Sequence, residues 1–431
     1  MKIADFYKTV AFPYGAGRIE VKIPKRNLLQ HLKAKDPPPL SGETGKIKSA
    51  LLNPIKVKPL HEVVKPGSKL VILVSDVTRP VPTHKLLPPI LNELRKVAVT
   101  SEDVVIVVAT GLHRKNTKAE LELMLGSRIV RDVRVVNHDA FDKRKLVYVG
   151  ETSRGTLLEI NSLVPNFDVR ILTGYIEPHE FAGFTGDGKS ILPGVSGMDT
   201  INRNHSLEML DHPKSRVGVL EGNPIHEDIV EAARMVGVDF ITNVVLNSKK
   251  EIAKVVAGDL VEAHRAGVKF NERYASLEVG RKADIVITSS GYPLDIDFYQ
   301  SVKSLVAAEP FVAEGGAIIL LAECKIGIGP HLFYSWMRTC SSPDQIMERI
   351  RIEGYNAEID HCYLLARILR KCDIVVVSSH PHVNKIGRKF IKTAKSAEEA
   401  LDAELRKRDG KADIVALPHA PRIIPKLTSI H

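Results

Sequence analysis

Short, unbroken apolar runs followed by polar turns recur along this chain, and they constrain its fold more than any other feature. The first three occupy residues 69–76 (KLVILVSD), 103–110 (DVVIVVAT) and 168–174 (DVRILTG). Runs of this length without polar alternation are typical of parallel strands that are buried on both faces. With helices predicted at 86–97 and 118–125, they predict an α/β fold whose mainly parallel sheet is flanked by helices.

The same rhythm restarts after residue 280 and predicts a second domain. Four further apolar runs, each paired with a polar turn, lie in the segments DIVITSSGYP, AIILLAECKIG, DIVVVSSHPH and ADIVALPHAP. A chain of 431 residues is long enough for two hydrophobic cores. We therefore predict two domains of this class, residues 1–275 and 276–431, with the last segment a candidate for crossing back to the first domain.

The charge and the aromatic content of the chain indicate which kinds of molecule it can bind. The formal net charge is +10, but the excess is spread along the chain and aromatic residues make up only 5%. Without an interleaved basic and aromatic surface, small anions are better supported as partners than nucleic acids. The chain shows neither a membrane-spanning apolar stretch nor a signal-peptide pattern, so we expect a cytoplasmic protein without a membrane partner. The four cysteines form no C-x-x-C pair, which favours packing over metal binding.

Polar residues with useful chemistry follow the first three apolar runs. Asp76 and Arg79 follow the first run, His113 follows the second, and a glycine-rich loop with His179 and Lys189 follows the third. In open parallel sheets, ligands bind beyond the carboxyl ends of the strands. We therefore predict that these residues meet at one edge of the sheet. There, imidazole groups can transfer protons near neutral pH and a guanidinium group can bind an anion.

The glycine-rich loop, residues 174–194, permits several interpretations. Its segment 183–190 (GFTGDGKS) has the residue pattern of a phosphate-binding loop, but Pro193 and Gly194 stop a helix from growing after Lys189. The lysine is also a candidate covalent attachment point, because burial lowers the pKa of an amine. From these residues alone, a nucleotide-binding protein and a metal-dependent hydrolase or lyase both stay open.

Three smaller patterns leave a structural and a functional interpretation open. His205, between polar neighbours, is either a structural histidine or a metal ligand. Asp76 and Thr78 suit a turn held by their side chains as well as they suit catalysis. A helix predicted to begin near Asp297 places Gln300 and Lys303 on one face near its N-terminal end, which suits a substrate carboxylate.

Four motifs together resemble one known family. They read SDVTRPVP at 75–82, ATGLHR at 109–114, PHEFAGFTGDGKSILPG at 178–194 and GYPLDIDFYQSVK at 291–303. In this order, and spread over most of the chain, they are similar to the nickel-dependent lactate racemase family.

The resemblance implies a two-domain α/β enzyme with its active site in the cleft between the domains and a nickel pincer nucleotide as cofactor. It implies that the cofactor is attached covalently at Lys189, that His205 is the nickel ligand, and that His113 and His179 form the acid–base pair. The other implied contacts are with the cofactor, from Asp76, Thr78, Gly186 and Gly188, and with the substrate, from Arg79, Tyr299, Gln300 and Lys303.

The implied reaction inverts the C2 centre of a 2-hydroxy acid, either lactate or a related acid. The α-hydrogen of such an acid is weakly acidic, so it leaves more easily as hydride and returns to the other face of a 2-keto intermediate. The implied partners are this small anionic substrate and cofactor-maturation enzymes. Asp187 stands where a small residue is expected, and its charge could bias recognition. Neither the oligomeric state nor a pocket role for Trp336 or Tyr363 follows from the sequence.

Overall fold

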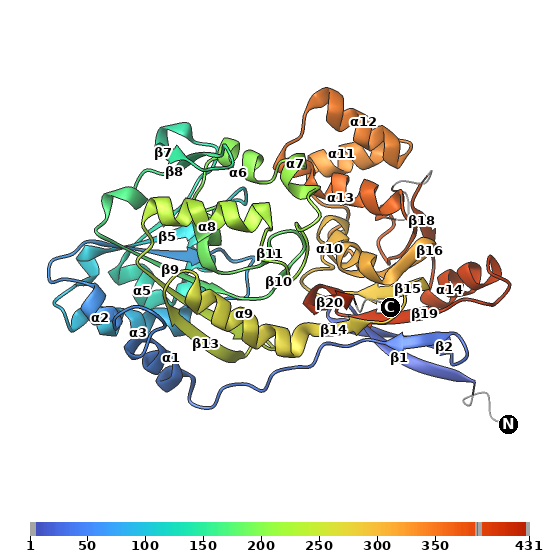
Figure 1. Cartoon of the computed structure of the whole chain (residues 1–431), viewed down its shortest axis with the longest axis horizontal. Helices are drawn as coiled ribbons and strands as arrows, with labels where there is room; N and C mark the ends of the chain where they lie inside the picture. The colour runs from blue at the N-terminus through green and yellow to red at the C-terminus, as the bar shows by residue number, and fades with distance from the viewer. Residues whose placement is uncertain (1–5, 384–385, 387–389, 428–431) are drawn as a thin grey trace. The chain divides into compact units, whose positions relative to one another are not determined.

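The computed structural model describes residues 6–383, 386 and 390–427, which form two compact units (Figure 1). One unit is continuous and comprises residues 36–274, whereas the other combines residues up to 35 with those from 275 onward. Each unit contains a six-stranded sheet. The predicted α/β class, with parallel sheets flanked by helices, is confirmed. Within these ranges, no helix is long and apolar enough to cross a membrane.

The sheet of the continuous unit has the strand order β13-β12-β9-β4-β5-β6, and it is parallel except where β13 pairs with β12. Its strands are β4 (Leu70–Ser75), β5 (Val104–Ala109), β6 (Arg134–Asn137), β9 (Val169–Tyr175), β12 (Phe240–Leu246) and β13 (Ile252–Gly258). The three apolar runs that open the sequence pattern form β4, β5 and β9, as predicted.

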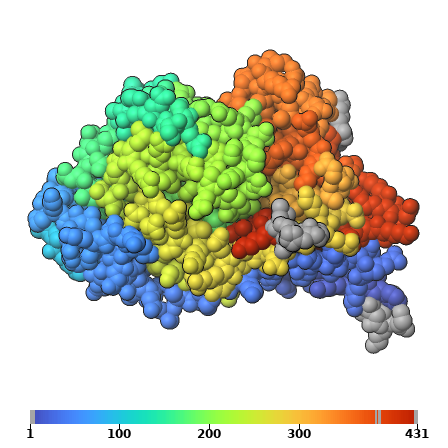
Figure 2. All heavy atoms as spheres, viewed as in Figure 1, coloured from blue at the N-terminus to red at the C-terminus, as the bar shows by residue number. Residues whose placement is uncertain are grey.

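Helices and two small ladders complete this unit. The helices are α1 (Glu43–Leu52), α2 (Leu60–Val63), α3 (Thr83–Arg95), α4 (Lys118–Leu125), α5 (Ser127–Asp132), α6 (Met198–Asn204), α7 (Leu207–Leu210), α8 (Pro224–Val236) and α9 (Glu262–Ala275). The ladders pair β7 (Leu146–Glu151) with β8 (Leu157–Asn161), and β10 (Pro178–His179) with β11 (Gly183–Phe184). The β7–β8 hairpin, teal in Figure 2, lies at the surface, where Tyr148 and Leu157 are more than half exposed.

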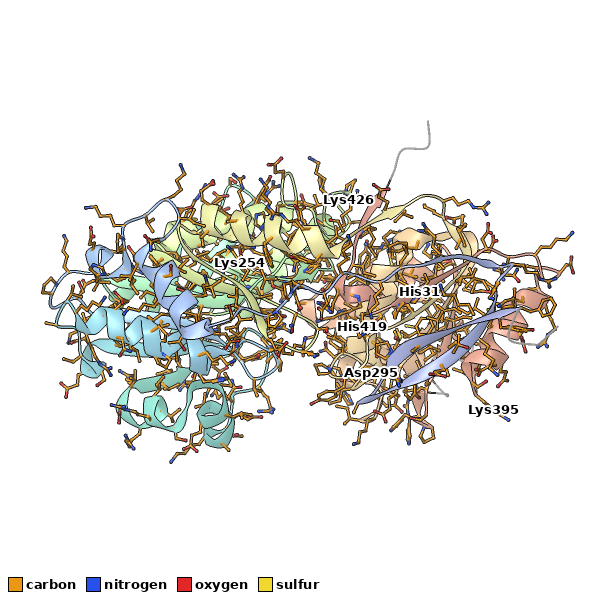
Figure 3. All side chains as sticks on the ribbon, turned by 90° about the horizontal axis from the view of Figure 1, so that it is seen from below. His31, Lys254, Asp295, Lys395, His419 and Lys426 are labelled. Atoms are coloured by element: carbon orange, nitrogen blue, oxygen red, sulfur yellow. The ribbon has the colours of Figure 1, made fainter. Side chains whose placement is uncertain are left out.

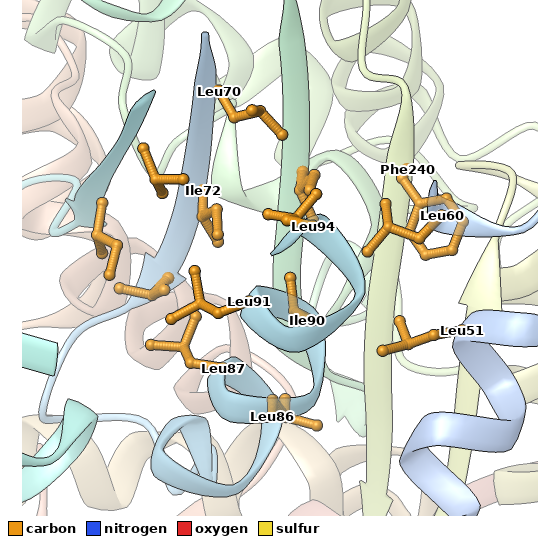
Figure 4. Close-up of a cluster of buried hydrophobic side chains, with 14 of the residues drawn as sticks. Leu51, Leu60, Leu70, Ile72, Leu86, Leu87, Ile90, Leu91, Leu94 and Phe240 are labelled. Atoms are coloured by element: carbon orange, nitrogen blue, oxygen red, sulfur yellow. The ribbon is translucent and has the colours of Figure 1, made fainter. Parts of the chain in front are cut away.

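Figure 4 shows how α3 covers one face of the sheet. Leu86, Ile90 and Leu94 recur at every fourth position, so they lie on one side of the helix. All three are fully buried in the same apolar cluster as Ile72 of β4. The strand is buried on both faces, which explains why its sequence is continuously apolar.

The direction in which strands are added to this sheet reverses at β4. β5 and β6 follow on one side of β4, whereas β9 lies on its other side. The loops after β4 and β9 therefore diverge, and such a switch point is where open α/β sheets bind ligands. Asp76 follows β4, and the glycine-rich loop follows β9. The segments that carry the predicted site residues of this unit thus leave the sheet at the switch point.

The other unit has the strand order β18-β17-β16-β15-β19-β3, and its sheet is parallel throughout. Its strands are β3 (Leu28–His31), β15 (Ala283–Ser289), β16 (Val312–Leu321), β17 (Asp373–Val377), β18 (Lys392–Ala394) and β19 (Ile414–Pro418). The four predicted apolar runs are β15, β16, β17 and β19. The helices are α10 (Phe298–Ala308), α11 (His331–Thr339), α12 (Pro343–Glu353), α13 (Asp360–Leu369) and α14 (Ala397–Arg406).

The first 35 residues depart from the predicted domain division, because they belong with this second unit. The hairpin of β1 (Tyr7–Tyr14) and β2 (Gly17–Pro24) buries Phe12 and Ile23 in the core of that unit. Asp295, labelled in Figure 3, accepts a 2.6 Å hydrogen bond from the amide of Gly15 in the hairpin turn. Alternating strands show which face is apolar but not which sheet they cover, so sequence reasoning assigned this segment to the wrong neighbour.

The end of the described chain also stays in the second unit. β20 (Ile424–Leu427) pairs in parallel with β14 (Ser276–Val279), and both strands belong to that unit. As far as residue 427, the last segment therefore stays in the second unit and does not cross back to the first. The predicted boundary near residue 275 coincides with the point where the chain re-enters the second unit.

Replacing Ile72 by alanine tests the packing of α3 on the sheet. Ile72 is fully buried, so Ile72→Ala should lower the free energy of unfolding by about 2–5 kcal/mol. Leu123→Ala on α4 is the control, because Leu123 is 74% exposed and its loss should have little effect. Urea denaturation followed by circular dichroism measures both. Equal losses in the two variants would contradict this description of the core.

Candidate active site

A buried carboxylate organises the turn after β4. Asp76 is 4% exposed, and its Oδ1 accepts hydrogen bonds from the Thr78 amide at 3.0 Å and the Thr78 hydroxyl at 2.6 Å. Its Oδ2 lies 2.6 Å from Nδ1 of His113, which follows the neighbouring strand β5. Asp76 and Thr78 therefore stabilise the turn through their side chains, as the structural interpretation predicts. The same Asp76 carboxylate also contacts His113, so the functional interpretation is compatible with the structure as well.

The charge of Asp76 fixes the ring proton of His113. Burial raises the pKa of Asp76. The hydrogen bond and charge of His113, the charge of Arg79 and the hydrogen bond of Thr78 together outweigh burial, so the pKa of Asp76 lies below its ordinary value. Asp76 is therefore a carboxylate, which can only accept a hydrogen bond. The neutral His113 ring carries its proton on Nδ1 and keeps a lone pair on Nε2. Its side chain is 39% exposed, so a ligand can reach it.

Arg79 is held in an acidic environment but makes no hydrogen bond to another described side chain. Burial lowers the pKa of Arg79, but neighbouring acidic groups, Tyr175 and Asp76 foremost, raise it above its ordinary value. The guanidinium group stays charged and can accommodate a carboxylate in a two-point contact. Tyr175 donates a 2.5 Å hydrogen bond to Glu177, a contact that the sequence did not indicate.

The glycine-rich loop brings His179 and Lys189 together. The β10–β11 ladder pairs His179 with Gly183, and the chain then forms a single 3-10 turn, η5 (Asp187–Ser190). Lys189 leaves this turn with its Nζ 3.5 Å from Nε2 of His179. The Ala182 amide donates to Nδ1 of His179 at 3.3 Å, and Oε2 of Glu180 lies 3.5 Å from the same nitrogen.

Two glycines of this loop are required by close packing. A Cβ atom on Gly188 would lie 2.7 Å from the Cβ of Ala233 on α8, and one on Gly186 would lie 2.9 Å from Ile176. Gly186 also has a φ of 97°, which disfavours residues with a side chain. These contacts explain why both positions are glycine. Their predicted contact with a cofactor stays a prediction.

His205 lies next to this pair through one aromatic ring. The ring of Phe181 is 4.6 Å from that of His179 and 5.0 Å from that of His205, both edge-on. Nδ1 of His205 lies 3.1 Å from the carbonyl oxygen of Ile201, so Nδ1 carries the proton and Nε2 keeps its lone pair. Burial, together with the positive charge of Lys189, lowers the pKa of His205 to about 4. A neutral imidazole with its second nitrogen fixed in this way is suited to metal binding.

The position of His205 is set by its neighbour in α6. The side-chain amide of Asn204 donates a 2.8 Å hydrogen bond to Asp228 of α8, and both residues are fully buried. Thr152 and Thr156 donate to the same carboxylate. This network anchors the end of α6, where His205 is the C-terminal capping residue.

Neither alternative interpretation of the loop gains structural support. Lys189 lies in one 3-10 turn and the next helix begins only at Met198, whereas a phosphate-binding loop opens directly into an α-helix. Among the described residues, no group of three His, Cys, Asp or Glu side chains has the geometry of a metal site, which a hydrolytic metal centre made by the protein alone would need.

The remaining predicted site residues belong to the other unit. The predicted helix is α10, whose capping residue Asp297 accepts a 2.7 Å hydrogen bond from the amide of Gln300. Gln300 and Lys303 lie in this helix and are partly buried. The hydroxyl of Tyr299 donates to Asp360 at 3.1 Å, which fixes its direction. The structure thus confirms the helix that carries these residues.

One buried histidine outside all the motifs supports the loop. His138 follows β6, and its Nε2 donates a 2.9 Å hydrogen bond to the carbonyl oxygen of Ser196, just after the glycine-rich loop. Asn161 donates to its Nδ1 at 3.3 Å. Burial lowers the pKa of His138 to about 4, against the opposing effect of the Ser196 contact. Sequence reasoning missed this residue because no spacing relates it to its partners.

Both halves of the chain are similar to domains of one known protein family. Residues 14–218 match the lactate racemase N-terminal domain, and residues 279–424 match the lactate racemase C-terminal domain. The chain is 37% identical over 398 residues to the lactate racemase of Thermoanaerobacterium thermosaccharolyticum, covering 91% of this chain and 93% of that protein. It is 36% identical over 384 residues to the lactate racemase of Lactiplantibacillus plantarum, covering 88% and 90%.

Solved structures show the same relationship. The lactate racemase apoprotein from Thermoanaerobacterium thermosaccharolyticum has a TM-score of 0.91 and 36% identity, covering 97% of this chain and 100% of that chain. A protein from Thermotoga maritima shares the fold, with a TM-score of 0.69 and 19% identity, covering 92% and 100%. The fold and the matched domains define a racemase, an enzyme of the isomerase class. The chain belongs to the lactate racemase family.

The buried neutral histidines predict how stability depends on pH. The pKa of His138 is about 4 in the folded protein and about 6.5 in an unfolded chain. Between these two pH values, the His138 side chain is therefore protonated in the unfolded state and neutral in the folded state. The free energy of unfolding should therefore fall between about pH 6.5 and 4, by up to about 1.4 kcal/mol per pH unit from this residue. Urea denaturation at several pH values measures this slope.

The variant His138→Gln should show a shallower slope, because glutamine does not take up a proton. His84→Gln, at an exposed position of α3, is the matched control and should keep the original slope. Identical slopes for the wild type and His138→Gln would contradict the assignment.

Proposed function

We propose that this enzyme is a racemase or epimerase that inverts the C2 centre of a 2-hydroxy acid, using a nickel pincer nucleotide attached at Lys189. The observation that carries the proposal is the grouping of His179, Lys189 and His205 around Phe181. It places a potential proton donor, a potential attachment point and a neutral metal-binding nitrogen in one loop region.

The residues present fit such a cofactor. Nickel accepts imidazole ligands, and His205 offers Nε2 while its other nitrogen is held by a carbonyl oxygen. Lys189 is partly buried, and its charge already acts on His205, so an attachment there is close to the proposed ligand. When bound, the cofactor would supply a hydride acceptor and donor, so that the α-hydrogen leaves as hydride and a planar 2-keto acid forms.

The two catalytic histidines are suited to complementary proton transfers. His113 presents a lone pair on Nε2, so it can take the hydroxyl proton while Asp76 stabilises the resulting positive ring. His179 is proposed as the partner on the other side, which in its protonated, imidazolium form can return a proton to the carbonyl oxygen of the 2-keto acid and is left as a neutral ring. For the opposite enantiomer the two roles exchange. Inversion in either direction requires one protonated and one neutral imidazole.

The substrate carboxylate needs partners that hold it while the planar intermediate turns. Arg79 supplies a charged guanidinium whose hydrogen-bonding groups are not used by other described side chains. Tyr299, Gln300 and Lys303 are the further proposed substrate-binding residues. Gly186, Gly188, Thr78 and Asp76 are proposed to contribute to cofactor binding, with Asp76 acting mainly through His113.

Lactate is the first candidate substrate, because the matched relatives are named lactate racemases. Related 2-hydroxy acids fit the same proposal, since the groups assigned here recognise the shared hydroxyl and carboxylate. Enzymes that mature the cofactor are proposed partners, because a nickel pincer nucleotide has to be made before it can be attached. Neither a nucleic acid nor a membrane is part of this proposal.

The mass of the Lys189 peptide tests the attachment. Protein produced in cells that also make the cofactor should yield a Lys189 peptide heavier than the unmodified one, whereas Lys189→Arg should yield no modified peptide and no racemisation. Fully active protein with an unmodified Lys189 peptide would refute the covalent proposal. Tight ATP binding by such protein would favour a nucleotide-binding function instead.

Three histidine variants separate catalysis from metal binding. His113→Ala and His179→Ala should each lower the racemisation rate by at least about 10²–10⁴-fold, the usual contribution of a general acid or base, and should retain nickel. His205→Ala should lose nickel as well as activity. Exposed His84→Ala is the control and should change neither. Enantiomer-specific assays of lactate and elemental analysis measure the two properties, and turnover retained by either of the first two variants would contradict the two-base mechanism.

A further inference from the structure

The guanidinium group of Arg79 lies among acidic groups but forms no ion pair with a carboxylate of the described residues. Four groups act on its pKa against the effect of burial and raise it: Tyr175, Asp76, Glu180 and Glu177. Arg79 is partly buried, and an unpaired charge is costly where little water solvates it. The structure must therefore contain contacts that keep the nearby carboxylates directed elsewhere.

The sheet brings Tyr175 to the turn that carries Arg79. β4 and β9 pair in parallel with Leu73 opposite Leu172, and Tyr175 is the last residue of β9. The amide of Arg79 donates a 3.1 Å hydrogen bond to the carbonyl oxygen of Asp76 in the turn after β4. Both side chains therefore start from the same edge of the sheet. The ring of Tyr175 is 6% exposed and packs in the apolar cluster of this unit, which fixes its position.

The hydroxyl of Tyr175 is bound to one of the carboxylates. It donates a 2.5 Å hydrogen bond to Oε1 of Glu177. Burial, together with the charge of Glu177, raises the pKa of Tyr175 well above its ordinary value, so the hydroxyl keeps the proton that it donates. Hydrogen bonds to a carboxylate are about twice as strong as those between neutral groups. This bond therefore holds the Glu177 carboxylate in a defined direction.

The backbone on both sides of this contact is fixed by Thr185. The amide of Glu177 donates a 2.9 Å hydrogen bond to the Thr185 hydroxyl, and its carbonyl oxygen accepts a 2.9 Å hydrogen bond from the Thr185 amide. The same hydroxyl donates to the carbonyl oxygen of Tyr175 at 2.8 Å. The Glu177 carboxylate can therefore change its partner only by rotation of its own side chain, while the backbone stays in place.

The other two carboxylates near the guanidinium group face the proposed catalytic histidines. Oδ2 of Asp76 lies 2.6 Å from Nδ1 of His113. Oε2 of Glu180 lies 3.5 Å from Nδ1 of His179. The carboxylate of Glu177 faces a tyrosine hydroxyl instead of a histidine. Each of the three carboxylates is thus directed at a group other than the guanidinium.

We propose that the Tyr175 hydroxyl holds the carboxylate of Glu177 away from Arg79 and so leaves the guanidinium group open for the carboxylate of a substrate. This inference rests on the proposed function, in which Arg79 binds that carboxylate. Tyr175 is a positioning residue, because it acts on Arg79 through Glu177. Without the hydroxyl, Glu177 rotates, forms an ion pair with Arg79 and competes with the substrate.

Crystal structures of the apoprotein test this arrangement directly. In Tyr175→Phe, which keeps the buried ring, a Glu177 oxygen should move to about 2.7–2.9 Å from an Arg79 nitrogen, the usual length of such a charged contact. Tyr148→Phe is the matched control, because Tyr148 is 57% exposed, and it should leave Arg79 unpaired. A Glu177 carboxylate that keeps its wild-type position in Tyr175→Phe would overturn the proposal.

Racemisation kinetics of the cofactor-loaded enzyme measure the consequence for binding. Tyr175→Phe should raise the KM for lactate about tenfold, because substrate has to displace a charge-assisted contact, and should leave kcat within about twofold. Tyr148→Phe should change neither constant.

The double variant Tyr175→Phe/Glu177→Gln distinguishes this role from a merely structural one. It should return KM close to the wild-type value, because a glutamine side chain cannot neutralise the guanidinium group of Arg79. A general loss of packing at Tyr175 would not be rescued in this way. An unchanged KM in Tyr175→Phe, or a raised KM that persists in the double variant, would contradict the proposal.

The two measurements separate this inference from the proposed function. If the loaded wild type racemises no 2-hydroxy acid, the proposed function fails, and the apoprotein structures still decide whether Tyr175 keeps Glu177 from Arg79. If the wild type racemises lactate but Tyr175→Phe leaves both Glu177 and KM unchanged, the proposed function stands and this inference fails.

Discussion

Parallel pairing of β4 with both β5 and β9 is the constraint on which the candidate site depends. It aligns the carboxyl ends of three strands, so residues separated by about a hundred positions in the sequence follow neighbouring strands. Asp76 can reach His113 at 2.6 Å because β4 and β5 are adjacent. The glycine-rich loop starts beside them because β9 is the other neighbour of β4. Without this strand order the same residues would have no common site.

Burial then gives each histidine a different character. His113 is partly exposed and faces a carboxylate, whereas His205 is buried, near a positive charge and bonded to a carbonyl oxygen. The first environment favours a ring that can accept a proton, and the second favours a ring that stays neutral and can bind a metal. One residue type thus has two different environments, because the degree of burial and the neighbouring charges differ, and the sequence alone does not display this difference.

The sequence predicted well the features that depend on local pattern. Continuous apolar runs predicted β4, β5 and β9, because a strand covered on both faces needs no polar side chain. The positions of His113 and His179 followed from the strand ends. By contrast, the carboxylate of Asp187 faces His226 on α8 and His264 on α9, and no spacing relates either histidine to the loop. The fate of the first 35 residues was mispredicted for the same reason, because an amphipathic hairpin fits any apolar surface.

The division of the chain also has a consequence for the order of assembly. Residues 36–274 form one continuous unit, so its sheet can close as soon as that stretch is available. The other sheet needs β3 beside β19, which joins Leu28 to Ile414 and spans almost the whole chain. Closing so large a loop is entropically costly and slows folding. During synthesis, β3 is made early, whereas its partner strand β19 is made only when nearly all of the chain is complete. Until then, β3 cannot form its backbone hydrogen bonds with this sheet.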